Sequence, residues 1–221
     1  MSTIKDIYII GSSGHASVVT ELIEQLCNYK IVGFIDDYKS PGEKFLNYEV
    51  LGNIEYIITI AKTKKIYVAI AIGDSNNREL ITNKLKDLSV IYPVLIHPSA
   101  QISKRSKIAE GTIIFANSIV ACNSIIGKHC LINHGCCIDH DSKIKDYVTL
   151  CPNVFIAGNV IIGYNTIIGL GTNIIEKIKI GKNVYIGAGS TVISNQRDNS
   201  VIFGCPAKYI RDNNDNEIFF K

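Results

Sequence analysis

The sequence lacks any apolar run near the ~18 residues that cross a membrane, and its first residues lack the apolar core of a secretory signal peptide. It also lacks a strong charge of one sign, since charged residues make up 19% of the chain and the formal net charge is +3. A positive charge this small and this scattered does not favour a nucleic acid or a membrane as a partner. The 47% of hydrophobic residues is instead enough for a real core in one or two domains.

Cysteine is present, but not in the patterns that hold metals or disulfides. None of the seven cysteines lies in Cys-x-x-Cys spacing, and their number is odd. Cys130 and Cys136 also belong to a column of small residues described below. We therefore expect reduced thiols, no metal site and a cytoplasmic location.

One long stretch of the chain repeats with a period of six, because every sixth residue from Ile102 to Val192 is aliphatic. A helix repeats its apolar face every ~3.6 residues and a strand every ~2, so neither produces this spacing. Short strands separated by turns produce it when the chain winds into a prism with three sides per coil. We therefore predict a β-solenoid whose core is formed by these anchor residues: Ile102, Ile108, Ile114, Val120, Ile126, Ile132, Ile138, Ile144, Leu150, Ile156, Ile162, Ile168, Ile174, Ile180, Ile186 and Val192.

A second column lies four residues after each anchor and is mostly small or β-branched, as at Ser118, Cys130 and Thr166. Side chains of this size suit the tight corners of a narrow prism. Glycine directly follows several anchors, where either a positive φ or a close approach of neighbouring coils calls for it: Gly127, Gly163, Gly169, Gly181 and Gly187. Coils stacked ~4.8 Å apart pair their backbone groups with the coils above and below, so the anchors form one continuous core.

The six-residue period ends before residue 96, which predicts an N-terminal domain over residues 1–95 and a β-solenoid domain over residues 96–221. Residues 7–10 read as a buried strand, followed by the turn Gly-Ser-Ser-Gly-His at 11–15 and by an amphipathic helix. Such a turn presents backbone N–H groups and a helix N-terminus, which together suit a phosphate or pyrophosphate.

Two further apolar runs end in polar residues, the first in Asp36 and Asp37 and the second in residues 73–76. The ends of parallel strands line a ligand crevice at one edge of the sheet. An acidic residue there could accept a hydrogen bond from a ribose hydroxyl or a pyrimidine N–H, although either aspartate could equally be a solvated loop residue. The glycine turn falls short of the full dinucleotide fingerprint. We predict a crevice for a nucleotide-linked substrate formed by Gly11, Ser13, Gly14, His15, Asp36, Asp37, Gly73 and Asn76.

The hexad repeat, the glycine turn, the aspartate pair and the tail Gly204-Cys205-Pro206-Ala207-Lys208 together resemble the sugar acetyltransferases of the NeuD and PglD type. The resemblance covers all but the C-terminal end of the chain. It implies a Rossmann-like α/β domain followed by a left-handed parallel β-helix, assembled as a homotrimer with acetyl-CoA bound between subunits. It further implies N-acetylation of the 4-amino group of a nucleotide-linked amino-deoxysugar.

The family motif of a histidine followed by an acidic residue, ahead of an Ala-Gly-Asn segment, matches His140, Asp141 and residues 157–159. The resemblance implies that His140 is the general base, that Asp141 orients it, and that the Gly158 amide donates to the thioester oxygen. Histidine suits this task near neutral pH, and no Ser or Cys nucleophile is needed. By the same resemblance, the coenzyme site includes Thr149, Ala157, Gly158, Gly187, Pro206 and Lys208.

Two histidines compete for the role of base. His134 lies one hexad before His140, at the same position of the repeat, so we expect that the stacking of the coils does not separate them. Only His140 lies between two acids, Asp139 and Asp141. Many family members carry a second histidine nine residues after the first, but Thr149 stands there and cannot shuttle a proton near neutral pH.

Three other functions stay open at this point. The first is O-acetylation of a sialic acid or similar sugar. The O-acetylating members of the same family have a similar N-terminal domain, so this domain does not exclude it. A regulatory module that binds a dinucleotide would bind NAD without acetyl transfer, but the second Gly-x-Gly element is missing at Gly11. An ice-binding solenoid needs a flat array of exposed threonines, whereas Thr112, Thr166 and Thr172 fall in the inward column. The nucleotide base, the sugar and the pathway are not specified by the sequence.

Overall fold

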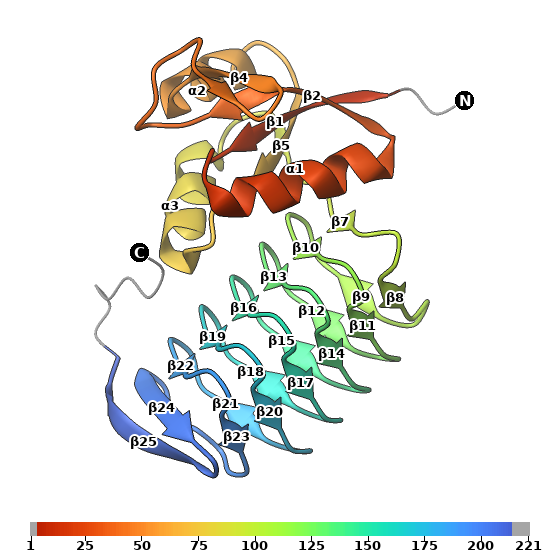
Figure 1. Ribbon diagram of the computed structural model, residues 1–221, viewed down its shortest axis with the longest axis vertical. Helices are drawn as coiled ribbons and strands as arrows, with labels where there is room; N and C mark the ends of the chain where they lie inside the picture. Colours follow the sequence, from red (N-terminus) through yellow and green to blue (C-terminus); the bar gives the residue numbers. More distant parts are fainter. Residues whose placement is uncertain (1–3, 214–221) are drawn as a thin grey trace. The chain divides into compact units, whose positions relative to one another are not determined.

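The computed structural model describes residues 4–213, which divide into two compact units between Leu95 and Ile96 (Figure 1). None of the helices in this described part is long and apolar enough to span a bilayer. The fold class is the predicted one, an α/β domain with a largely parallel sheet followed by a parallel β-helix.

The N-terminal unit is built on a six-stranded sheet with the order β3-β4-β2-β1-β5-β6. All neighbouring strands in it are parallel except β3 and β4. Every residue from Ile7 to Ile10 is buried, as expected for a central strand covered on both faces. The elements are β1 Lys5–Ile10, α1 Gly14–Leu26, β2 Tyr29–Ile35, β3 Lys44–Phe45, β4 Tyr48–Gly52, α2 Ile54–Ala61, β5 Ile66–Ile70, α3 Ser75–Leu85 and β6 Val90–Ile91.

The C-terminal unit is a β-helix made of two-residue strands in which each anchor is the second residue. The strands are β7 Leu95–Ile96, β8 Gln101–Ile102, β9 Lys107–Ile108, β10 Ile113–Ile114, β11 Ile119–Val120, β12 Ile125–Ile126, β13 Leu131–Ile132, β14 Cys137–Ile138, β15 Lys143–Ile144, β16 Thr149–Leu150, β17 Phe155–Ile156, β18 Ile161–Ile162, β19 Ile167–Ile168, β20 Asn173–Ile174, β21 Lys179–Ile180, β22 Tyr185–Ile186 and β23 Thr191–Val192. A hairpin follows, with β24 at Ser200–Gly204 and β25 at Ala207–Asp212.

Strands pair in parallel with a spacing of 18 residues, as between Val120 and Ile138, so one coil consists of three hexads. The prism therefore has three walls (Figure 1). The first wall contains β7, β10, β13, β16, β19, β22 and the hairpin; the second contains β8, β11, β14, β17, β20 and β23; the third contains β9, β12, β15, β18 and β21. The anchors from Ile114 to Val192 are buried in one core.

The glycines that follow the anchors serve close approach and not a positive φ. A Cβ on Gly127 would lie 2.6 Å from the backbone N of Asp146 in the next coil, and one on Gly169 would lie 2.6 Å from that of Ala188. The positive φ angles fall instead on the third residue after the anchor, where asparagine recurs because it tolerates the left-handed region. These residues are Gly111, Asn117, Asn123, His129, Gly135, Asp141, Tyr147, Asn153, Asn159, Asn165, Gly171, Lys177, Asn183 and Gly189.

The hydroxyls of the small-residue column bond one coil to the next. Six of them are fully buried and donate to the backbone carbonyl 15 residues further along the chain, as Thr112 does to Gly127 at 2.7 Å. The residues that do this are Thr112, Ser118, Ser124, Ser142, Thr166 and Thr172. The column therefore supplies polar contacts inside an otherwise aliphatic core.

Candidate active site and acceptor pocket

His140, Asp141 and Gly158 come together at the corner between the second and third walls. His140 and Asp141 follow β14, and Gly158 follows β17, which pairs with β14 in parallel. Since residues 18 apart stack on each other in successive coils, Gly158 lies directly beside His140.

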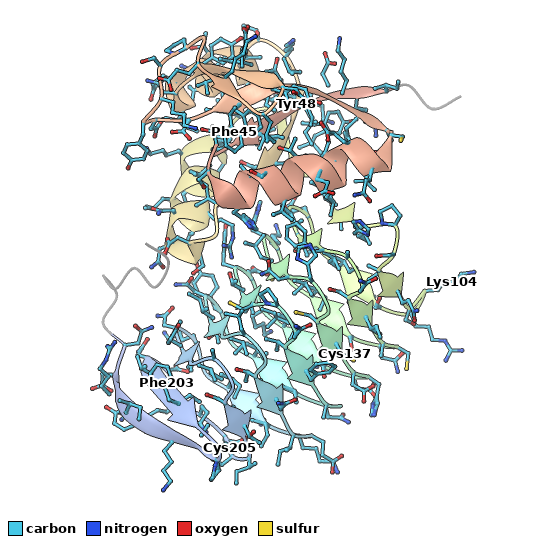
Figure 2. All side chains as sticks on the ribbon, viewed as in Figure 1. Phe45, Tyr48, Lys104, Cys137, Phe203 and Cys205 are labelled. Carbon is cyan, nitrogen blue, oxygen red and sulfur yellow. The ribbon has the colours of Figure 1, made fainter. Side chains whose placement is uncertain are left out.

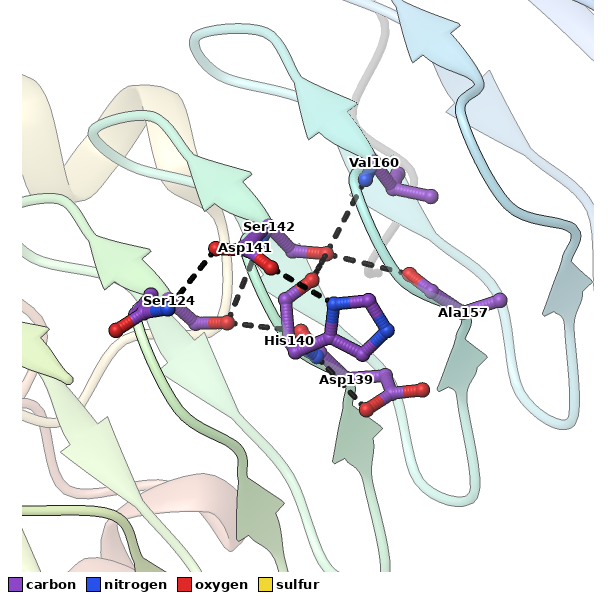
Figure 3. Close-up of polar contacts among 8 residues, drawn as sticks. Ser124, Asp139, His140, Asp141, Ser142, Ala157 and Val160 are labelled. Atoms are coloured by element: carbon purple, nitrogen blue, oxygen red, sulfur yellow. Dashed lines mark hydrogen bonds and ion pairs between the residues drawn. The ribbon is translucent and has the colours of Figure 1, made fainter. Parts of the chain in front are cut away.

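Two aspartates hold His140, one through its imidazole and the other through its backbone N–H. Its Nδ1 lies 2.8 Å from Oδ2 of Asp141, and its backbone N–H donates to Oδ1 of Asp139 at 2.7 Å (Figure 3). The other carboxylate oxygen of Asp141 accepts from Nδ2 of Asn123 at 3.1 Å. Asp141 has a φ of 57°, which a short polar residue accepts at this corner. An ionised Asp141 keeps the ring proton on Nδ1 and leaves Nε2 as the basic nitrogen.

These carboxylates strengthen His140 as a base. The hydrogen bond to Asp141, followed by the negative charges of Asp139, Asp141 and Glu176, raises the pKa of His140 above its ordinary value. The hydrogen bonds from His140 and Asn123 lower the pKa of the Asp141 carboxyl. About half of the His140 side chain is exposed, so an acceptor can reach it from solvent.

Glycine is required at position 158 because the imidazole occupies the space of a side chain. A Cβ on Gly158 would lie 2.6 Å from both Cε1 and Nε2 of His140. The preceding residue, Ala157, is fixed by its carbonyl, which accepts a hydrogen bond from Oγ of Ser142 at 3.2 Å. The basic nitrogen of His140 therefore faces the backbone of the 157–158 segment.

The other residues predicted for the coenzyme lie elsewhere in the prism. Thr149 is a buried residue of β16 in the first wall, and Gly187 follows β22 in the same wall. A Cβ on Gly187 would overlap the ring of Phe203, which is labelled on the hairpin in Figure 2. Pro206 forms a cis peptide bond with Cys205 in the hairpin turn, and Lys208 is exposed on β25. In a three-sided prism the first wall lies opposite the corner of His140. A single chain therefore does not bring the predicted coenzyme residues of the first wall and the hairpin close to His140.

His129, His134 and His140 lie at three different corners of the β-helix. His129 follows the third wall and stacks on Tyr147, with 5.4 Å between ring centroids. His134 follows the first wall and stacks on Phe115 at 5.0 Å. The expectation that stacking does not separate His134 from His140 is therefore wrong, because the coil repeats after 18 residues and not after six.

The N-terminal unit contains a cavity of about 500 Å³ at the ends of β1, β2 and β5. Such a volume suits a ligand of the size of a nucleotide. Its lining includes the predicted residues Gly11, Ser13, Asp36 and Asp37, but not Gly14, His15, Gly73 or Asn76. The complete lining is Ile10, Gly11, Ser12, Ser13, Ile35, Asp36, Asp37, Tyr38, Ile54, Ile72, Asn77, Leu80, Ile81 and Lys84.

The two aspartates of this pocket have different partners. Oδ2 of Asp36 accepts from the backbone N and the hydroxyl of Ser12, at 3.0 and 2.6 Å, and its Oδ1 accepts from the backbone N of Tyr38 at 2.9 Å. Asp37 accepts from the backbone N of Ile54 at 2.9 Å, at the start of α2. Asp36 therefore organises the glycine turn, and Asp37 caps a helix.

One side of α3 lines the pocket and was missed in the sequence. Its lining residues Asn77, Leu80, Ile81 and Lys84 recur at the three- and four-residue spacing of one helix face. That spacing is visible in the sequence. Because the face mixes polar and apolar residues, it does not stand out as a core-facing surface.

Known proteins are similar to this chain over both of these sites. Residues 6–85 match the family described as the PglD N-terminal domain. The whole chain has the architecture of PglD-type proteins, in which this domain precedes a hexapeptide-repeat β-helix. A UDP-N-acetylbacillosamine N-acetyltransferase of Bacillus subtilis is 33% identical over 120 residues, a match that covers 51% of this chain and 52% of that protein.

Solved structures that are similar to this chain extend over nearly all of it. The acetyltransferase domain of PglB from Neisseria gonorrhoeae, in complex with acetyl coenzyme A, is 28% identical with a TM-score of 0.87, covering 93% of this chain and 99% of that one. A histidine mutant of perosamine N-acetyltransferase from Caulobacter crescentus, in complex with CoA and GDP-perosamine, is 29% identical with a TM-score of 0.89, covering 95% and 99%.

Proposed function

We propose that this protein is an acetyl-CoA-dependent N-acetyltransferase that acts on the 4-amino group of a nucleotide-linked amino-deoxysugar. The observation that carries the proposal is the contact of His140 with Asp141 on one side and with the 157–158 segment on the other. A base and a backbone donor side by side are what acyl transfer to an amine needs. The similar structures that bind acetyl-CoA, or CoA and GDP-perosamine, support the same chemistry.

His140 acts as the base in this proposal. The sugar amine attacks the thioester carbonyl carbon, the C–S bond breaks, and CoA leaves as its thiolate. Nε2 of His140 takes one amine proton and passes it to the departing sulfur. Asp141 holds the Nδ1–H tautomer and stabilises the imidazolium that forms in between. The raised pKa makes His140 a stronger base, but requires a pH above that pKa for the neutral form.

The pocket of the N-terminal unit holds the nucleotide in this proposal. Ser13 is the N-cap of α1 without a side-chain cap, and the first turn of that helix carries no acidic residue. The amides at this end therefore suit a diphosphate. Lys84 adds a positive charge on the pocket wall, and the apolar side chains of Leu80 and Ile81 suit the face of a base or sugar.

The proposed assembly is a homotrimer with acetyl-CoA between neighbouring copies. It is supported by the separation of His140 from Thr149, Gly187 and Lys208, because a second copy can set its first wall against the corner of His140. Exposed apolar side chains on the second wall, Ile119 and Phe155, also favour burial against another copy. Cyclic closure covers such surfaces in every copy. A monomer by light scattering that keeps full activity would contradict this assembly.

The function is tested by measuring thiol release from acetyl-CoA with a panel of UDP-, dTDP- and GDP-linked 4-amino-deoxysugars. We expect release with at least one of them, together with a product that is one acetyl group heavier by mass spectrometry. The same sugars carrying a 4-hydroxyl are the matched controls. Release with the hydroxyl sugars and not with the amines would replace N-acetylation by O-acetylation.

A further inference from the structure

Beyond the base and its aspartate, the proposed site depends on how the peptide between Ala157 and Gly158 is oriented. Ser142 is fully buried inside the prism, and its Oγ donates to the Ala157 carbonyl at 3.2 Å (Figure 3). In a planar trans peptide the C=O and the following N–H point in opposite directions. The Ala157 carbonyl points into the core, so the Gly158 N–H points out of it, on the side of His140.

At three other positions of the β-helix, a buried hydroxyl also bonds a backbone carbonyl, and the acceptor of the following N–H can be identified. Thr112, Ser124 and Thr166 donate to the carbonyls of Gly127, Asp139 and Gly181. The next N–H in each case bonds an exposed carboxylate: Lys128 to Asp146 at 2.8 Å, His140 to Asp139 at 2.7 Å, and Lys182 to Asp198 at 2.9 Å. At these three positions, a buried hydroxyl therefore goes with an outward N–H that binds a carboxylate oxygen.

The N–H of Gly158 differs from these three N–H groups because it has no protein acceptor in the described part of the chain, residues 4–213. The nearest group is the His140 ring, whose Cε1 and Nε2 would crowd a Cβ on Gly158. The outward amide therefore lies beside the basic nitrogen, where the oxygen of a reacting thioester would be placed.

Ser142 also fixes the far side of this segment. Its Oγ accepts from the backbone N of Val160 at 3.2 Å, while its own backbone N donates to Oγ of Ser124 at 3.3 Å. One buried hydroxyl thus bonds both the residue before Gly158 and the residue two after it. The coil of His140 and the coil of Gly158 are joined by this side chain.

We infer that Ser142 is a positioning residue of the acetyl-transfer site, whose hydroxyl aims the Gly158 N–H at the thioester oxygen. The inference rests on the proposed function and adds to it a residue that touches neither substrate. A misdirected donor stabilises the oxyanion less but leaves ground-state binding of the coenzyme largely intact. The effect of losing Ser142 should therefore fall on kcat and not on the KM for acetyl-CoA.

The chain offers a matched control in Thr166. It is equally buried, donates to the Gly181 carbonyl at 2.9 Å and accepts from the backbone N of Val184 at 3.1 Å, at the corner between the third and first walls. Ser142→Ala and Thr166→Val each remove one hydroxyl with the same two hydrogen bonds. We expect similar decreases in melting temperature, but a fall in kcat of about 10- to 10²-fold only for Ser142→Ala.

Two further measurements separate positioning from general loss of structure. Ser142→Thr keeps the hydroxyl in a column that already holds threonine, and it should restore kcat. The infrared carbonyl band of bound acetyl-CoA labelled with ¹³C should lie at lower frequency in wild type and in Thr166→Val than in Ser142→Ala, because a donated hydrogen bond weakens the C=O bond.

If Ser142→Ala fails to fold, Ser142→Val takes its place, since Val148 and Val154 occupy the same column.

An active wild type in which Ser142→Ala and Thr166→Val have equal kcat, or equal carbonyl bands, overturns the role of Ser142 while leaving the proposed function in place. A wild type that releases no thiol from acetyl-CoA with any amino sugar overturns the proposed function itself, and the role of Ser142 with it.

Discussion

The two units of this protein differ in how their sequences encode a site. The β-helix repeats one hexad, so each anchor supports the assignment of the next, and the proposed chemistry lies where the repeat carries unusual residues, at His140 and Gly158. The N-terminal unit has no repeat, and its pocket draws on the ends of β1, β2 and β5 and on one face of α3. Regularity makes a fold easy to predict, while a site that draws on several elements is visible only once they are assembled.

This difference leads to a kinetic expectation. Changes at the His140 corner should lower kcat, because in the proposed mechanism that corner handles protons and the thioester oxygen. Changes in the N-terminal pocket should raise the KM for the acceptor. The following predictions test this division, beginning with the largest effect.

His140→Ala should lower kcat by roughly 10²- to 10⁴-fold, because general base catalysis contributes about that much, while acetyl-CoA still binds. His134→Ala is the control, since His134 has the same hexad position at another corner. Steady-state rates and calorimetric binding of acetyl-CoA measure both variants. A His140→Ala enzyme that retained more than about a tenth of the wild-type kcat would remove His140 from the role of base, and His134 would be the next candidate.

Asp141→Asn should lower kcat on the order of 10²-fold, because the ring loses the partner that fixes its tautomer and position. Asparagine tolerates the positive φ of this corner, so the fold should persist. The carboxylate raises the pKa of His140, so its loss should move the rising limb of kcat/KM to lower pH. An unmoved limb would show that Asp141 does not set this pKa.

Asp36→Ala should raise the acceptor KM by about 10- to 10²-fold, the equivalent of ~1.5–3 kcal/mol for hydrogen bonds to a charged group. The reason is loss of the contacts to Ser12 and Tyr38 that shape the glycine turn. Asp37→Ala should in addition cost about 1 kcal/mol of stability at the start of α2, because its carboxylate accepts from the backbone N of Ile54. A fall in kcat with an unchanged acceptor KM would move Asp36 out of the binding role.

Thr149→Val should have the smallest effect, no more than the ~0.5–1.5 kcal/mol of one neutral hydrogen bond. Valine keeps the shape of threonine, and position 149 is buried in the first wall. Steady-state kinetics with acetyl-CoA as the varied substrate would measure the change. A loss as large as that of His140→Ala would give Thr149 a part in the chemistry.

The fold of the β-helix could be predicted because its dominant force, burial of the anchor column, is written directly in the sequence. The corner geometry was predicted only in part. Close approach was expected correctly at the glycines directly after the anchors, but a positive φ was considered only there. The residues with a positive φ lie two positions further on, where asparagine recurs, as at Asn117, Asn123, Asn153 and Asn159. The hydroxyl column was interpreted by size alone, although its hydrogen bonds prove to join the coils.

The site could be predicted less completely, because contacts between distant elements decide it. A six-residue period cannot tell one corner from another, so His134 and His140 were separated only by the neighbouring acids. The 18-residue coil separates them in space. Asp36 faces the predicted pocket, but its oxygens bond the protein's own Ser12 and Tyr38, which no spacing in the sequence could reveal.

The central claim is that His140 is the base of an acetyl transfer, and the pH profile of kcat/KM for the acceptor at saturating acetyl-CoA tests it most directly. Wild type should show a rising limb with a pKa above the ordinary histidine value of about 6.5, because Asp141 and Asp139 raise the pKa of His140. His140→Ala should lose this limb along with most of its rate. A limb of the same pKa that survives in His140→Ala would belong to the acceptor amine, and would contradict the assignment of His140.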